Sequence, residues 1–387
     1  MKLLALLMRV LAALLDLLPC KQRVALMSRQ SSTESLDFEL LAAELRARLG
    51  DDAVELCLCE PETKDKLAFA AGTLRQLMLG RSSKVVVLDG YNPAVCIPPR
   101  RRGTSVVQLW HALGAVKRFG YQSIDTPAGR SSEQARVACM HENYSLVVAS
   151  GPGAVPAYSE AFRYPAAAIE PLGLPRMDYL LDPSPRAPRR QRMEQLRKEH
   201  PALRCGKRVI VYAPTLRKGK GYDGWIARYL GELAQACPAE RAVLVFAGHP
   251  LDREGAQELA REHECLHVLP GAATIDLLGL ADCVITDYSA ISLEAGLLRV
   301  PTCFFAPDIE RYVASPGLNV DLASGAAGFC SADAAELMAV ALGDSPAAAP
   351  SFERWQVFCD AYFEGTGHGA TARLADRIQQ LLFSEEH

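Results

Sequence analysis

The 387-residue chain has little excess charge of either sign and no cysteine pair of the CxxC type. Its 42 Lys and Arg residues face 45 Asp and Glu residues, which gives a formal net charge of −3. A balance of this kind lacks the basic footprint of nucleic-acid-binding proteins, so we expect no nucleic-acid partner. The 12 cysteines are scattered along the chain, and this scatter indicates reduced thiols in the cytosol rather than a disulfide framework.

No uninterrupted apolar run is long enough to cross a bilayer, which takes about 20 residues. Residues 1–18 are almost all Leu, Ala, Met and Val, but Arg9 and Asp16 interrupt them. A signal peptide begins with a positively charged region, and here only Lys2 precedes the apolar run. No small-residue cleavage pattern follows either, so we expect no signal peptide. Lys2, Arg9 and Asp16 recur every seven residues and therefore share one stripe of a helix. We predict that residues 1–20 form an apolar helix lying on a surface, either a membrane interface or a protein.

From Arg23 onward, strand and helix patterns alternate, and this order predicts an α/β fold with mostly parallel sheets. The length suggests two domains, and a Pro- and Arg-rich stretch near residue 180 marks the boundary, giving domains 21–180 and 181–387. The final helix, 370–383, could pack back across the first domain. Strands are predicted at 24–27, 54–59, 84–89, 105–109, 146–149, 209–212, 242–246, 266–269, 283–285 and 302–305.

In the second half, three strands are followed by polar loops. The stretch 283–301 runs as strand, turn and helix, and the Ser289 hydroxyl at the helix start favours an anion such as a diphosphate. An ordinary capped helix is the alternative. Two other strands end at Arg217-Lys218 and at Gly-His249-Pro. Because such loops share one edge of a parallel sheet, we expect these cationic and hydroxyl groups to meet in one crevice.

In the first half, one strand delivers Trp110 and His111 to a loop with Gly114 and Gly120. Histidine titrates near neutral pH, so His111 could take a proton from an attacking hydroxyl. A structural histidine packed beside Trp110 is the alternative.

Four motifs taken together resemble the CDP-glycerol glycerophosphotransferase family of teichoic acid synthesis. They are Trp-His-Ala-Leu-Gly-Ala-Val-Lys-Arg-Phe-Gly, Tyr-Ala-Pro-Thr-Leu-Arg, Gly-His-Pro and Ile-Thr-Asp-Tyr-Ser, in this order. The resemblance runs from about Met27 to the C-terminus. It implies a GT-B fold, with two Rossmann-like domains whose parallel sheets face a central cleft. It also implies transfer of glycerol phosphate from CDP-glycerol to a hydroxyl on a polyprenyl-diphosphate-linked acceptor or on a growing polyol-phosphate chain. Family members work at the cytoplasmic face of the cell membrane, which favours a peripheral membrane role for the N-terminal helix.

The resemblance also assigns roles to residues. It makes His111 the general base and gives Glu294 a weak role in holding the ribose or the motif itself. The residues expected to bind the donor are Arg217, His249, Thr286, Asp287, Ser289, Ser292 and Glu294. Those expected on the acceptor side are Ser28, Arg29, Gln30, Trp110 and Lys117.

The chain departs from the family pattern at two positions. Ala112 stands where members commonly have Gly, and Ala290 stands where they have a second Ser. Ser292 or backbone N–H groups could compensate for the lost hydroxyl. Two alternatives to a CDP-glycerol-dependent transferase stay open. One is a catalytically silent GT-B module, for which the departures are the only support. The other is a transferase that uses CDP-ribitol as its donor.

The sequence also lacks side-chain spacings that are typical of metal sites. No Asp-x-Asp pair follows a predicted strand, and Asp51-Asp52 falls in a turn. His263, Cys265 and His267 alternate as ligands on a strand could, but no fourth ligand is placed nearby. We therefore expect no metal site and no tightly bound cofactor, with CDP-glycerol as a substrate.

Overall fold

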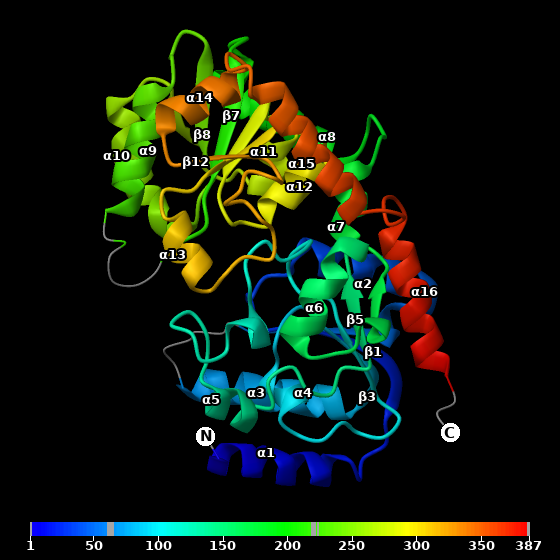
Figure 1. Ribbon diagram of the computed structural model, residues 1–387. Helices are drawn as coiled ribbons and strands as arrows, with labels where there is room; N and C mark the ends of the chain where they lie inside the picture. Colours follow the sequence, from blue (N-terminus) through cyan, green and yellow to red (C-terminus); the bar gives the residue numbers. More distant parts are fainter. Residues whose placement is uncertain (1, 60–65, 218–221, 223, 385–387) are drawn as a thin grey trace. The chain divides into compact units, whose positions relative to one another are not determined.

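The computed structural model describes residues 2–59, 66–217, 222 and 224–384, and the chain divides into two compact units (Figure 1). Lys218, named above for the diphosphate crevice, lies outside the described residues. The first unit contains Met1–Gly114, Arg118–Asp178 and Phe363–His387, and the second contains Ala115–Lys117 and Tyr179–Tyr362.

The first unit is built on a six-stranded sheet in the order β2-β1-β3-β4-β5-β6, with every neighbouring pair parallel. Its central strands are buried on both faces, as parallel strands covered by helices on both sides must be. The strands are β1 (Lys21–Ser28), β2 (Val54–Leu58), β3 (Ser83–Leu88), β4 (Ser105–Gln108), β5 (Leu146–Ala149) and β6 (Ile169–Pro171).

The helices of this unit contact the sheet and one another in two groups. Helices α1 and α4 pack on α3, which contacts the first three strands, whereas α16 packs on α2 and contacts β1 and β3 (Figure 1). Their bounds are α1 (Lys2–Leu15), α2 (Leu36–Leu49), α3 (Lys66–Arg81), α4 (Pro93–Cys96), α5 (Ser132–Val137), α6 (Val155–Phe162) and α16 (Ala370–Phe383), and α7 (Pro175–Leu181) crosses into the second unit.

The C-terminal helix α16 is fixed to the first unit by its own cap. The Asp178 carboxylate accepts hydrogen bonds from the backbone N–H groups of Gly369 (2.6 Å) and Thr371 (2.8 Å), at the start of the helix. A carboxylate in this position satisfies N–H groups that lack a partner within the helix. Further along, Arg377 pairs with Glu170 of β6 at 2.9 Å.

The second unit has a six-stranded parallel sheet in the order β12-β11-β10-β7-β8-β9. Alternate residues of β7 enter two separate cores: Ile210 and Tyr212 pack towards α9, α10 and α14, whereas Val209 and Val211 pack towards α8, α11 and α12. The strands are β7 (Arg208–Ala213), β8 (Ala242–Phe246), β9 (Leu266–Val268), β10 (Cys283–Thr286), β11 (Thr302–Phe305) and β12 (Phe329–Ser331).

Among the described residues, five helices of the second unit lie between these strands along the chain, as the alternating pattern predicts, whereas α8 precedes β7 and α14 and α15 follow β12. The helices of this unit are α8 (Pro188–Glu199), α9 (Trp225–Ala236), α10 (Arg253–Glu262), α11 (Thr274–Leu278), α12 (Ile291–Leu297), α13 (Ile309–Ala314), α14 (Ala334–Leu342) and α15 (Ala348–Tyr362). The predicted α/β class with parallel sheets is confirmed.

Strand order locates the binding edge of each unit. The order reverses between β1 and β3 in the first sheet and between β7 and β10 in the second. At such a reversal the connections leave in opposite directions and open a crevice at the carboxyl ends of the strands. A binding site is therefore expected at the β1/β3 edge of the first sheet and at the β7/β10 edge of the second.

Candidate active site

The β1/β3 edge of the first unit brings together Ser28, Gln30 and Asp89. Ser28 ends β1 and its hydroxyl accepts from the Gln30 backbone N–H at 3.0 Å. Gln30 lies against Gly90, the residue after Asp89, where an added Cβ would stand 2.4 Å from the Gln30 amide nitrogen. A side chain at position 90 would therefore displace Gln30.

Asp89 is a buried carboxylic acid at this edge. Its side-chain Oδ1 has no hydrogen-bond partner among the described residues. Burial raises the pKa of Asp89 to about 6, although a hydrogen bond from Ser28 opposes the shift. The folded protein thus keeps a proton-sensitive carboxyl group next to the predicted base.

His111 follows the neighbouring strand β4, and its side chain is exposed. Its Nδ1 lies 3.2 Å from the carbonyl oxygen of Asp89. Because a carbonyl oxygen can only accept, Nδ1 carries the proton in the neutral ring, and Nε2 presents a lone pair. This tautomer is the one that a general base requires.

Trp110 supports the histidine ring. The two ring centroids are 4.2 Å apart, and Trp110 also stacks on Phe119 at 4.6 Å. The backbone of Trp110 is left-handed, with φ of 63°, and its N–H donates to Gln108 at 2.8 Å. The strained turn is therefore held by a buried amide, as strained residues at functional sites must be held by their surroundings.

Arg29, predicted on the acceptor side, is buried beneath this edge. Its guanidinium donates to Thr73 and Gln76, each at 3.2 Å, and stacks over the Phe69 ring. Burial lowers the pKa of Arg29. Gln76 in turn donates to the Ser28 carbonyl at 2.8 Å, so Arg29 holds the loop after β1 through Gln76.

The β7/β10 edge of the second unit is closed by a buried ion-pair network. Asp287 follows β10 and accepts from the Thr215 backbone N–H (3.0 Å), from the Thr215 hydroxyl (2.7 Å) and from Arg217 (2.8 Å). Arg217 also pairs with Asp308, three residues beyond the end of β11, at 2.9 Å. Three loops are thus tied together by one arginine and two aspartates.

Arg217 has a side chain only 3% exposed, with aromatic rings of Trp225, Tyr288 and Tyr312 at 4.9 to 5.2 Å. Burial opposes its charge, but Asp287 and Asp308 outweigh burial and raise the pKa of Arg217 above its ordinary value. The guanidinium is permanently charged and directed at protein carboxylates.

Most hydroxyl groups of the stretch 283–301 are also bonded to protein groups. Thr286 is buried and donates to the Ala213 carbonyl of β7 at 2.7 Å. Ser292 is buried and donates to the Ser289 carbonyl at 2.9 Å. Ser289 itself is partly exposed and accepts from the Ile291 N–H at 3.4 Å, while Glu294 is buried within the first turn of α12.

His249 is exposed at the end of the loop after β8. Its Nδ1 accepts from the Leu251 N–H at 3.2 Å and so caps the short helix that follows. The proton of the neutral ring therefore sits on Nε2, which makes His249 a hydrogen-bond donor. Burial raises the pKa of Asp252, and His249 and Arg217 oppose that shift.

Lys117 lies in the second unit, not with the acceptor-side residues of the first. Its backbone bridges Leu318, and Asn319 donates to the Val116 carbonyl at 2.8 Å. Burial lowers the pKa of Lys117, and the Asp287 carboxylate opposes that shift. The resemblance implies an acceptor-side role for Lys117, and this role stays a prediction. The structure groups the segment Ala115–Lys117 with the second unit, where Lys117 lies near the Asp287 carboxylate.

Three polar residues of these edges were missed by sequence reasoning. Asp89 ends the predicted strand 84–89 and Thr215 lies three residues beyond the predicted strand 209–212, so their positions at strand ends were a usable signal. Asp308 carries no comparable motif.

Each of the two units has a parallel sheet with a polar edge at its switch point, as the units of a GT-B fold do. The chain matches the family model described as CDP-Glycerol:Poly(glycerophosphate) glycerophosphotransferase over residues 12–380. The protein therefore belongs to this family, which confirms the resemblance read from the four motifs, and its predicted activity is the one that the family description names.

Several relatives have known roles. A teichoic acid ribitol-phosphate primase of Bacillus spizizenii is 31% identical over 303 residues, covering 78% of this chain and 76% of that protein. A teichoic acid glycerol-phosphate primase of the same species is 25% identical over 300 residues, covering 78% and 75%. The solved wall teichoic acid polymerase TagF aligns with a TM-score of 0.74 at 17% identity, over 98% of this chain and 97% of that one. This likeness confirms the GT-B fold.

Proposed function

We propose that the protein transfers glycerol phosphate from CDP-glycerol to a hydroxyl group of a lipid-linked teichoic acid acceptor. The acceptor oxygen attacks the phosphorus that carries glycerol, the bond from that phosphorus to the bridging oxygen breaks, and CMP leaves. The hydroxyl proton passes to Nε2 of His111. The observation that carries this proposal is the hydrogen bond from His111 Nδ1 to the Asp89 carbonyl, which leaves Nε2 as the basic nitrogen.

On the acceptor side, Ser28, Gln30 and Trp110 border His111 or the neighbouring strand end and are proposed to contact the acceptor. Arg29 is proposed to act indirectly, because its guanidinium is bonded to Thr73 and Gln76. Asp89 positions the base through its backbone carbonyl.

On the donor side, His249, Lys117 and Ser289 are proposed to contact the diphosphate. Cationic and N–H donors stabilise the charge that develops as CMP leaves, and such groups supply most of the acceleration in phosphoryl transfer. Arg217, Asp287, Thr286 and Ser292 are proposed to hold the loops in place, because each of their polar side chains is bonded to protein groups. Glu294 is proposed to support the same turn.

A CDP-ribitol donor is the second candidate. It is favoured by the ribitol-phosphate primase at 31% identity, against 25% for the glycerol-phosphate primase. Ribitol is longer by two hydroxymethylene groups, so the mass of the product separates the two donors.

We further propose that the protein works peripherally at the cytoplasmic face of the membrane. Within the described part of the chain, every helix falls short of the length and hydropathy that a membrane crossing needs. Helix α1 instead exposes a row of leucines, including Leu3 (70%) and Leu14 (58%), as an interfacial helix would.

The test is an incubation of the purified chain with either CDP-alcohol and a synthetic lipid-linked acceptor, followed by mass spectrometry. We expect a product heavier by one glycerol phosphate. A product with ribitol phosphate alone would transfer the proposal to the second donor. Tight CDP-alcohol binding without any product would instead indicate the catalytically silent module.

A further inference from the structure

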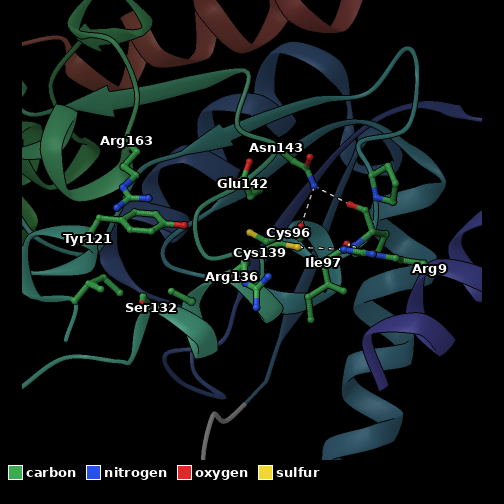
Figure 2. A pocket seen from close by; sticks show the side chains of 14 residues that line it. Arg9, Cys96, Ile97, Tyr121, Ser132, Arg136, Cys139, Glu142, Asn143 and Arg163 are labelled. Atoms are coloured by element: carbon green, nitrogen blue, oxygen red, sulfur yellow. Dashed lines mark hydrogen bonds between the residues drawn. The ribbon is translucent and has the colours of Figure 1, made fainter. Parts of the chain in front are cut away.

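A cavity of about 530 Å³ opens in the first unit, and none of the predicted site residues lines it. Three arginines line it, each from a different part of the fold: Arg9 from α1, Arg136 from α5, and Arg163 at the end of α6. In Figure 2, Arg9 and Arg163 lie at opposite ends of the cavity, with Arg136 between them. The volume is in the range of pockets that hold small ligands.

The cavity carries excess positive charge. Glu142 is its one acidic lining residue, and no carboxylate among the described residues forms an ion pair with Arg9, Arg136 or Arg163. Arg9 donates to the Ile97 carbonyl at 3.2 Å and approaches the Cys139 sulfur at 3.4 Å. These neutral contacts fix the guanidinium without cancelling its charge.

Helix α1 brings an apolar surface to the same place. Its Ala5, Met8 and Ala12 are buried, and the opposite face is exposed. The neighbouring helix α3 adds further exposed apolar side chains. The exposed residues are Leu3, Leu4, Leu6, Leu7, Val10, Leu11 and Leu14 of α1, and Leu67, Phe69, Leu74 and Met78 of α3.

Charge indicates what covers this surface. Asp16 is the only acidic residue among the first 18, and it is paired with Arg81 and lies 3.8 Å from Arg101. Lys2 of α1 pairs with the exposed Glu133 of α5 at 3.5 Å. The surface therefore presents apolar side chains beside arginines that have no ion-pair partner among the described residues. A second copy of the chain would bring like charges together, whereas an anionic bilayer matches both the apolar and the cationic groups.

We propose that this cavity binds the phosphate headgroup of an anionic membrane phospholipid, with the acyl chains lying along the exposed face of α1. Guanidinium groups suit this ligand because their paired N–H donors match phosphate oxygens. The proposal rests on the peripheral membrane role proposed above, and not on the transfer reaction.

The test measures partitioning of the full-length chain onto phosphatidylcholine vesicles with and without phosphatidylglycerol. The variant Arg9→Gln/Arg136→Gln/Arg163→Gln should bind the anionic vesicles about a hundredfold more weakly, because each arginine near an anionic surface contributes roughly fivefold. Its binding to pure phosphatidylcholine should change little. Equal binding of variant and wild type to anionic vesicles would overturn the proposal.

Two controls separate a headgroup site from general charge. The variant Arg190→Gln/Arg197→Gln/Arg204→Gln removes three exposed arginines of the second unit and should bind vesicles within about twofold of wild type. The variant Arg9→Lys/Arg136→Lys/Arg163→Lys keeps the charge but loses the paired N–H donors, so it should bind anionic vesicles more weakly than wild type. Full binding by the lysine variant would refute a headgroup site.

Cys139 offers a local readout because it lines the cavity and is partly exposed. Short-chain phosphatidylglycerol, below its micelle concentration, should slow alkylation of Cys139 as measured by peptide mass spectrometry, whereas inorganic phosphate should not. Equal protection by inorganic phosphate would mean a simple anion site and would overturn the lipid assignment. Turnover of a soluble short-chain acceptor should persist in the glutamine variant, so a failure here is distinct from a failure of the transferase assignment.

Discussion

The two switch-point edges use their polar residues in different ways. At the β1/β3 edge, His111 is exposed and Asp89 has a carboxylate oxygen without a partner among the described residues. At the β7/β10 edge, Arg217 and Asp287 are buried and bonded to each other. The first edge presents groups suited to proton transfer, whereas the second uses charge to hold three loops together.

A polar residue at the end of a strand can therefore take part in a reaction or hold loops together. Its burial distinguishes the two roles, because a buried side chain is bonded to protein groups. Neighbouring loops of the second unit keep His249 exposed and Ser289 partly exposed. The buried network would thus serve as a platform for the donor contacts proposed for these two residues. Variants at the two edges should consequently fail in different ways.

The largest effect is expected from His111→Ala. Loss of a general base lowers turnover by about two to four orders of magnitude, while the affinity for the CDP-alcohol should be nearly unchanged because the proposed donor contacts lie in the second unit. Steady-state kinetics and calorimetric CDP-glycerol titration measure the two quantities. His368→Ala, at another exposed histidine of the first unit, should leave both near wild type. A matching loss of donor affinity in His111→Ala would place this residue in the donor site and erase the contrast between the edges.

Arg217→Ala is expected to lower the stability of the second unit. Removing one partner of a buried ion pair costs about 3–5 kcal/mol, and here two carboxylates would lose their counter-charge. The free energy of unfolding of the second unit, measured by denaturant titration, should fall by that amount. Arg197→Ala, at an exposed arginine of the same unit, should change it by less than about 0.5 kcal/mol. A stable Arg217→Ala protein that has only lost CDP affinity would show that Arg217 is a ligand contact after all.

Much of the fold could be predicted because buried parallel strands are continuous apolar runs. The ten predicted strands are present, most with ends displaced by a residue or so. Two were missed: β6 (Ile169–Pro171) and β12 (Phe329–Ser331) have three residues each and are too short to leave a pattern. Helix α5 is short and ends at Val137, because Cys139 and His141 beyond it have left-handed backbones.

The candidate site was less predictable because it depends on burial and on distant partners. His111 could be found from its strand and loop, since those are local. The ion pair of Arg217 with Asp308 could not be predicted, because Asp308 lies 91 residues further along the chain. Lys117 is surrounded in the sequence by residues of the first unit, and its bridge to the distant Leu318 is what groups it with the second.

The smallest expected effect concerns Asp89 and sharpens the comparison through pH. Burial raises the pKa of Asp89 from its ordinary 3.8 to about 6. Between these values the folded state binds more protons than the unfolded state, so the free energy of unfolding falls as pH rises and the full penalty applies above about pH 6. Asp89→Asn removes that penalty. Its stability relative to wild type should therefore increase by on the order of 2–3 kcal/mol between pH 4 and pH 7.

The matched control is Asp344→Asn, at an exposed carboxylate of the second unit. The ion pair with Arg241 lowers the pKa of Asp344, so its contribution to stability is lost only as pH falls below its ordinary value of 3.8. Between pH 4.5 and pH 7 the stability difference from wild type should be flat. Denaturant titrations of both variants and wild type across this range give the two profiles. A flat profile for Asp89→Asn would mean that Asp89 is ionised and satisfied in the folded protein, and that the first edge, like the second, is internally neutralised.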